Sequence, residues 1–223
     1  MSTSGAPSAA KPGSAYPNLV VVDHPLLRHK VSLLRDRTTP KKIFKELVDE
    51  IAMLMAYEVT ADLLTEEYAL STPLEETTGQ RVVGELLTLV PILRAGLGMV
   101  EGVLRLIPTM RVGHIGLYRH HDTLQPIDYY FKIPPSPAES EFIVTDPMLA
   151  TGGSASAAIR FLKQSGARRI RLMSIVAAPE GVERMLADHP NTPVFTAALD
   201  RQLNEHGYIL PGLGDAGDRL FGT

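Results

Sequence analysis

No cysteine occurs among the 223 residues of the chain, which excludes disulfides, thiolate nucleophiles and cysteine-ligated metal centres. No apolar run reaches the roughly 18 residues that a membrane-spanning helix needs. The first 18 residues, MSTSGAPSAAKPGSAYPN, contain no hydrophobic stretch of the kind found in secretion signals. Together these absences predict a cytoplasmic protein with no membrane partner.

Positive charge is not in excess either. Twenty-two Lys and Arg face 25 Asp and Glu, which leaves a formal net charge of −3. Such a protein has no overall positive field to attract nucleic acid or anionic lipid, so any anionic ligand must be held by a local group of residues. The hydrophobic fraction of 44% is that of a folded globular protein.

The composition divides the chain into a short tail and one long domain. Residues 1–18 are mostly Ala, Ser, Gly and Pro with little to bury, which predicts a disordered tail. Residues 19–223 are expected to form a single domain, in which a helix spans Phe44 to Val59 because its apolar residues follow 3.6-residue spacing. Further strands are expected at 86–93, 111–118, 142–145, 171–177 and 194–199, and further helices at 98–106, 154–164 and 180–187.

This alternation of strands and helices indicates an α/β fold, a largely parallel twisted sheet with helices on both faces. Residues 118–134 differ, because two strand ends flank a polar loop there, and they predict a protruding hairpin or flap. Gly166 follows a predicted helix at the position that favours a left-handed C-terminal cap.

The most informative stretch is FIVTDPMLATGGSAS, residues 142–156. A buried strand ends at Asp146, and a Thr-Gly-Gly-Ser turn then opens a helix. Backbone N–H groups from Thr151 to Ser154 can cradle a phosphate there, because the glycines let it approach the backbone closely. A plain helix cap with a glycine turn is the alternative. A Walker A loop is excluded, since no Lys precedes the Ser.

Two further stretches can carry chemistry. In VPILRAGLGM a strand delivers Arg94 into a glycine-bearing turn, where a guanidinium could bind a phosphate or diphosphate through two parallel hydrogen bonds, or could simply be a solvated charge. The terminal YILPGLGDAGDRLFGT combines four Gly and two Asp with apolar residues, which is unlike a simple tail.

Five segments in order, VPILRAGLGM, GLYR, DPMLATGGSA, VAAPEGVER and GYILPGLGDAGDRLFGT, give the protein a strong resemblance to the uracil phosphoribosyltransferase family from Val20 to Thr223. The resemblance implies a type I phosphoribosyltransferase fold with a flap hairpin and a C-terminal base-binding hood. It also implies transfer of phosphoribose from 5-phosphoribosyl-1-diphosphate (PRPP) to uracil, giving UMP and diphosphate in pyrimidine salvage. Mg²⁺ is implied as cofactor, bound mainly through PRPP with no direct protein ligand.

The resemblance also assigns roles to individual residues. Arg94, Arg119 and Asp146 match the catalytic positions, with both arginines on the diphosphate and Asp146 facing the ribose hydroxyls. The PRPP loop is matched by Asp146, Pro147, Met148, Leu149, Ala150, Thr151, Gly152, Gly153 and Ser154, with Asp215 also facing the donor. The uracil-binding segment is matched by Ile209, Gly214, Asp215 and Ala216. A homo-oligomer, dimer or tetramer, and GTP as an effector are further expectations.

One segment departs from the family pattern. After Arg119 the family has an Asp-Pro-Glu-like triplet, whereas this protein has His120, His121 and Asp122. A metal site at the two histidines is not expected, because no third nitrogen or sulfur ligand has suitable spacing. Two alternatives to uracil transfer stay open: transfer to another base, and a non-catalytic RNA-binding pyrimidine regulator on the same scaffold.

Overall fold

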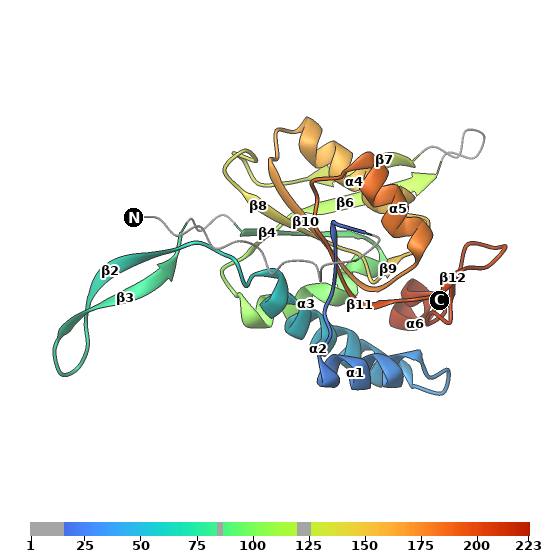
Figure 1. Cartoon of the computed structure of the whole chain (residues 1–223), viewed down its shortest axis with the longest axis horizontal. Coiled ribbons are helices and arrows are strands. Elements are labelled where there is room, and N and C mark those ends of the chain that lie inside the picture. The colour runs from blue at the N-terminus through green and yellow to red at the C-terminus, as the bar shows by residue number, and fades with distance from the viewer. Residues whose placement is uncertain (1–15, 84–86, 120–125) are drawn as a thin grey trace.

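The computed structural model describes residues 16–83, 87–119 and 126–223. Its main sheet has the strand order β1-β11-β10-β8-β4-β6-β7, with two short strands at its margin, β5 on β4 and β9 on β10 (Figure 1). The bounds are β1 Leu19–Val21, β4 Leu87–Leu93, β5 Arg111–Val112, β6 His114–Arg119, β7 Pro126–Lys132, β8 Glu141–Thr145, β9 Met148–Leu149, β10 Arg169–Ala177 and β11 Val194–Leu199. All neighbours pair in parallel except β6 and β7.

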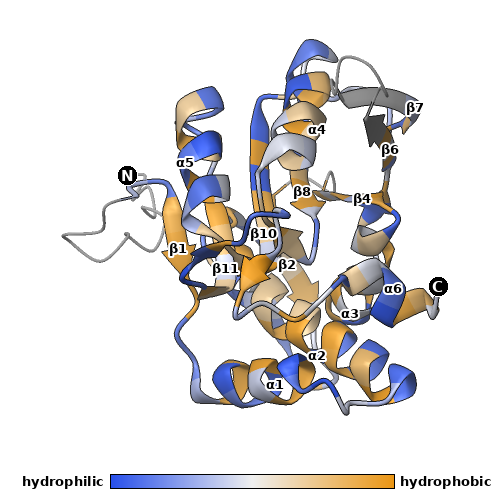
Figure 2. Ribbon diagram, turned by 90° about the vertical axis from the view of Figure 1, so that its right-hand side faces the viewer, coloured by the Kyte–Doolittle hydropathy of each residue, from blue (hydrophilic) through white to orange (hydrophobic). Residues whose placement is uncertain are grey.

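Helices cover both faces of this sheet (Figure 2). One layer holds α1 Pro25–Arg35, α2 Lys41–Val59, the 3-10 turn η1 Ala95–Met99 and α3 Val100–Leu106, and the other holds α4 Gly153–Gln164 and α5 Pro179–Asp188. Successive strand residues feed opposite layers: on β8, Ile143 packs with the α2 side, while Phe142 and Val144 pack with the α4 side. This alternation is expected, because side chains two residues apart share a sheet face. A largely parallel sheet with helices on both faces confirms the predicted α/β architecture.

Local predictions hold within a residue or two in the sheet, except that the one strand expected at 111–118 is divided at Gly113 into β5 and β6. The helices expected at 154–164 and 180–187 are α4 and α5, and Gly166 takes the left-handed conformation, with φ 98°, just after α4. The hairpin expected at 118–134 is the antiparallel pair β6–β7. Its turn, residues 120–125 with His120, His121 and Asp122, lies outside the described residues. None of the helices in the described ranges combines the length and apolarity needed to cross a membrane.

Two features differ from the sequence-based expectations. Residues 16–18, which the sequence placed in the tail, are held by the domain: Tyr16 donates a hydrogen bond to Glu183 at 3.1 Å and the Asn18 carbonyl accepts one from Val194 N. The rest of the expected tail, residues 1–15, lies outside the described residues. No element was expected between Thr60 and Gly84, yet β2 Thr65–Ser71 and β3 Glu76–Val82 form an antiparallel hairpin that projects from the body (Figure 1).

Beside the main sheet and the β2–β3 hairpin, the C-terminal residues form a separate structural unit, which we call the hood. It consists of the small ladder β12 Gln202–Leu203 with β13 Ile209–Leu210, followed by the loop to α6 Ala216–Phe221. Leu213, Ala216 and Leu220 anchor it in the same apolar cluster as α1 and α2. That packing explains why the terminal sequence retains apolar residues.

Candidate active site

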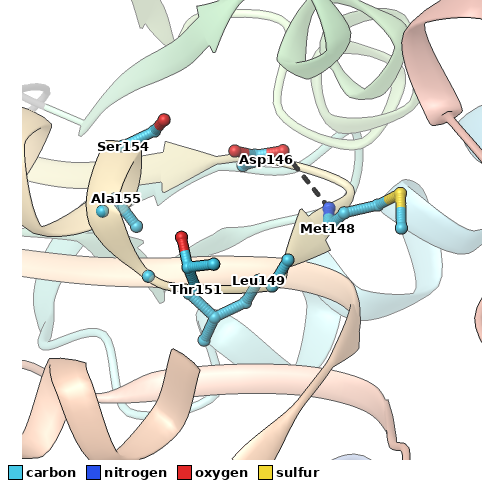
Figure 3. Close-up of a pocket in the computed structure, with 9 residues that line it drawn as sticks. Asp146, Met148, Leu149, Thr151, Ser154 and Ala155 are labelled. Atoms are coloured by element: carbon cyan, nitrogen blue, oxygen red, sulfur yellow. Dashed lines mark hydrogen bonds between the residues drawn. The ribbon is translucent and has the colours of Figure 1, made fainter. Parts of the chain in front are cut away.

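A pocket opens where β8 ends and α4 begins (Figure 3). It is lined by Asp146, Met148, Leu149, Ala150, Thr151, Gly152, Gly153, Ser154 and Ala155, which covers the predicted PRPP loop except for Pro147. Gly152 caps α4 in the left-handed conformation, with φ 73°. A β-carbon at that position would lie 2.9 Å from the Gly181 carbonyl oxygen. The turn therefore requires a glycine, as the phosphate-cradle interpretation expects.

The loop between Asp146 and the α4 cap is held along its length. Pro147 O accepts hydrogen bonds from Ile175 N and Val176 N, both at 3.1 Å, and Leu149 O accepts one from Ala178 N at 2.9 Å. Residues Met148–Leu149 thereby become the short strand β9 against β10, which the sequence did not predict. A loop fixed in this way presents its backbone N–H groups to a ligand without first having to be ordered.

Asp146 is the one acid among the pocket-lining residues. Burial, with a smaller contribution from the nearby charge of Asp215, raises the pKa of its carboxyl to about 6. A hydrogen bond from Met148 N at 3.2 Å favours the charged form and acts against this rise. A carboxylate held at this cost, at the carboxyl end of a parallel strand, has the character of a functional group.

Arg94 lies at the neighbouring strand end, in the turn between β4 and η1. Its side chain is exposed, with the guanidinium carbon 5.9 Å from the centre of the Phe221 ring in α6. Gly96 brings this turn close to Asp146, because a β-carbon there would overlap the carbonyl oxygen of Thr145. A cationic side chain from β4 and an acid from β8 thus flank one edge of the sheet.

The hood closes the third side of the site. Asp215 caps α6 by accepting a hydrogen bond from Asp218 N at 2.9 Å, and its charge acts on Asp146. Gly214 is exposed with φ 81°, whereas Ile209 and Ala216 are each only 3% exposed. Ile209 and Ala216 therefore present little surface to a ligand, and most of the accessible backbone in this segment is that of Gly214.

The structure brings three groups of predicted site residues together, and it places a fourth, Arg119, only by its backbone. The Arg94 turn, the Asp146–Ser154 loop and the Ile209–Ala216 segment surround the same sheet edge. Arg119 ends β6, whose residue Gly116 pairs with Leu93 of β4. Its backbone is thus two strands from Asp146, and its side chain is not among those described.

Sequence reasoning missed two charged residues that bind the backbone of the hood. Arg35 forms a bidentate ion pair with Asp200, with N–O distances of 2.6 and 2.7 Å, and the Asp200 side chain is only 5% exposed. A signal was available, because Asp200 directly follows a parallel strand, as Asp146 does. Its partner lies 165 residues away, and nothing local indicates that pairing.

Comparisons with known proteins identify the family. The family model for uracil phosphoribosyltransferase matches residues 21–223. A uracil phosphoribosyltransferase of Thermoanaerobacter sp. (strain X514) is 59% identical over 208 residues, which cover 93% of this chain and 99% of that protein.

Solved structures show the same fold. The AQ2163 protein from Aquifex aeolicus superposes with a TM-score of 0.86 at 35% identity, over 91% of this chain and 97% of that one. A hypoxanthine phosphoribosyltransferase from Staphylococcus aureus, at 11% identity and a TM-score of 0.51 over 71% of this chain and 76% of that one, shares the fold alone. The mostly parallel sheet with helices on both faces is thus that of a type I phosphoribosyltransferase. With a family match that runs from Val21 to the last residue and includes the Arg94 turn, the Asp146–Ser154 loop and the hood, the chain belongs to the uracil phosphoribosyltransferase family.

Proposed function

We propose that the protein transfers the phosphoribosyl group of PRPP to N1 of uracil, giving UMP and diphosphate in pyrimidine salvage. The observation that carries the proposal is the meeting of the Asp146–Ser154 loop with the hood in a member of this family. In the reaction the bond from C1 of ribose to the diphosphate oxygen breaks, the bond from C1 to uracil N1 forms, and the N1 proton is released. PRPP and uracil are the implied small-molecule substrates.

The donor is held at both ends by groups that the site provides. Backbone N–H groups from Thr151 to Ser154 suit the 5′-phosphate, and the Asp146 carboxylate can accept hydrogen bonds from the ribose hydroxyls. Arg94 and Arg119 are proposed to stabilise negative charge on the leaving diphosphate, while positive charge develops on the ribose ring. Such a site works by positioning and electrostatic stabilisation, without a covalent intermediate.

Mg²⁺ fits the same proposal as a companion of the donor. In the described ranges no three His, Cys, Asp or Glu side chains are grouped to hold a metal ion, and the pocket offers instead the Asp146 carboxylate with the charge of Asp215 nearby. Carboxylates together with substrate phosphates and water suit Mg²⁺. When bound through the diphosphate, the ion would neutralise charge on the leaving group, and these two acids would face its water shell.

The base is proposed to be read by backbone groups of Ile209, Gly214 and Ala216. Uracil presents an N3–H donor between two carbonyl acceptors, which a backbone carbonyl flanked by N–H groups can match. Cytosine exchanges donor and acceptor at two of these positions, so two buried groups would lose their partners, each at a cost of about 1 to 3 kcal/mol.

The direct test is product formation by the purified native protein with PRPP, Mg²⁺ and one base at a time. We expect UMP from uracil and a kcat/KM for cytosine lower by about a hundredfold or more, from two unsatisfied groups. Comparable use of cytosine, or preference for hypoxanthine or orotate, contradicts the uracil assignment. RNA binding without UMP formation would identify a regulator instead.

We also propose that the protein works as a homo-oligomer, because the β2–β3 hairpin has too little to pack against in one copy. Its side chains are mostly exposed, including Leu74 at 94% and Val82 at 44%. An isolated two-stranded hairpin is marginal in water, so contact with a second copy would supply the missing burial. Light scattering should give a dimer or tetramer mass, and a monomer mass contradicts the proposal.

Two further expectations complete the proposal, one on an effector and one on location. GTP as an effector is tested by adding it to the same assay at subsaturating PRPP. A cytoplasmic location is supported by the absence of cysteine, and a fluorescent fusion in cells tests it.

A further inference from the structure

Arg35, in the last turn of α1, bridges the sheet and the hood. Its guanidinium pairs with both Asp200 oxygens and also donates to the Gly212 carbonyl at 2.7 Å. Asp200 Oδ2 in turn accepts a hydrogen bond from Gly212 N at 2.9 Å. One ion pair therefore binds both polar backbone groups of Gly212, which lies between Ile209 and Gly214.

Gly212 also packs closely against the hood backbone, where no side chain fits. Its φ is 59°, and a β-carbon would overlap the carbonyl oxygen of Ile209. The Asp200 side chain is 5% exposed and that of Arg35 is 22% exposed, so solvent screens this pair little. The hood backbone is thus fixed at one residue by contacts on three sides.

A second arginine fixes the next residue along. Arg219 of α6 donates to the carbonyls of Leu213 and Leu34, each at 2.8 Å, and to that of Asp36 at 2.7 Å. Its guanidinium carbon lies 4.2 Å from the centre of the Phe44 ring. The carbonyls of Gly212 and Leu213 are therefore each bound by an arginine, the first by Arg35 and the second by Arg219. Gly214 is the next residue, and its backbone is exposed.

From this arrangement we propose that Arg35 and Asp200, aided by Arg219, are positioning residues that set the affinity and selectivity for the base without touching it. The inference rests on the proposed function, in which residues 209–216 read uracil through their backbone. Backbone readout depends on a fixed placement of N–H and C=O groups, because a hydrogen bond weakens steeply once its angle or distance is lost.

The ion pair is suited to this task by its chemistry. Burying two charges yields little net stability, since desolvation offsets most of their attraction. What the pair supplies is geometry, because a planar guanidinium binds two carboxylate oxygens and a carbonyl in fixed directions. Lysine keeps the charge at this position but cannot make all three contacts at once.

The experiment compares native protein with Arg35→Lys, Arg35→Gln and Asp200→Asn in steady-state kinetics. We expect the KM for uracil to rise about tenfold or more in each, from the loss of charge-assisted contacts to Gly212, and the uracil-over-cytosine ratio to fall. The KM for PRPP should stay within about twofold, because the donor loop is held by separate hydrogen bonds to β10. Amide exchange at Gly212 should become faster in the same variants.

Lys42→Gln serves as the matched control, because Lys42 is an exposed cation on α2, 83% accessible, paired with Glu46 at 3.8 Å. It should leave both KM values unchanged. An unchanged uracil KM in folded Arg35→Lys and Arg35→Gln overturns the inference, as does an equal rise in both KM values. If Asp200→Asn does not fold, the two Arg35 variants decide the question. If native protein forms no UMP, the proposed function itself fails, which is a different outcome from a native enzyme with insensitive variants.

Discussion

Asp146→Asn should make the free protein more stable and, at the same time, a much poorer enzyme. We expect a gain of up to about 3 kcal/mol in the free energy of unfolding at pH 7.5. The loss in kcat/KM for PRPP should be about 10- to 100-fold, as for a charge-assisted hydrogen bond. A substitution that raises the free energy of unfolding but lowers kcat/KM indicates a group that serves ligand binding and destabilises the fold.

The stability effect follows from the pKa of Asp146, which burial raises from an ordinary 3.8 to about 6. Between these values the folded state binds the proton that the unfolded protein releases, so stability falls as pH rises through that window. Above about pH 6 the full cost of a buried charge is present. Asparagine removes that charge, and its side-chain oxygen can still accept the hydrogen bond from Met148 N.

The activity effect follows from the need for an ionised carboxylate. In the proposed site the ribose hydroxyls donate to the charged form of Asp146, so PRPP affinity in the native enzyme should fall as pH is lowered through about 6. Phosphate groups of the donor also titrate near pH 6. The Asn variant separates the two contributions, because it retains only the titration of the donor.

Thermal unfolding of the free proteins and PRPP kinetics from pH 5 to 8 measure both effects. Asp23→Asn is the control, since Asp23 is an exposed acid that pairs with Arg28 at 3.1 Å, far in the sequence from the site. It should change neither quantity appreciably. Unchanged PRPP kinetics in Asp146→Asn would remove this residue from the donor site.

The parts of the fold that could be predicted are those whose burial shows as a pattern among neighbouring residues in the sequence. Strand β8 packs against both helix layers and therefore appears in the sequence as a continuous apolar run, while α2 shows apolar residues at 3.6-residue spacing. Asp146 and the Thr-Gly-Gly-Ser turn were also readable, because a strand, an acid and a glycine turn follow each other directly.

The parts that were not predicted depend on distant residues or on missing burial. The β2–β3 hairpin buries neither face against the rest of the protein, so its sequence lacks the alternation that reveals a half-buried strand. Strand β9 forms because Ile175 and Val176 of β10, and Ala178 just after it, offer N–H groups to the carbonyls of Pro147 and Leu149. The Arg35–Asp200 pair joins α1 to the end of β11, and only folding brings them together.

The second large effect is expected at Gly214. A β-carbon at this residue would meet nothing closer than Arg219 Cδ at 3.7 Å, so the free protein has room for a side chain. The space in front of it is where the proposed base lies. Gly214→Val should therefore raise the KM for uracil about tenfold or more by obstructing the base, with a smaller change in the KM for PRPP.

Backbone strain must be separated from obstruction, because Gly214 has φ 81° and any L-residue there costs about 1 to 2 kcal/mol. Gly166→Val is the matched control: Gly166 is exposed, has φ 98°, and a β-carbon there would lie 3.8 Å from Pro137, far from the hood. Both variants should lose similar stability in thermal unfolding, but only Gly214→Val should lose affinity for uracil. Equal uracil KM values in the two variants would show that the base does not approach Gly214 and is recognised by other residues.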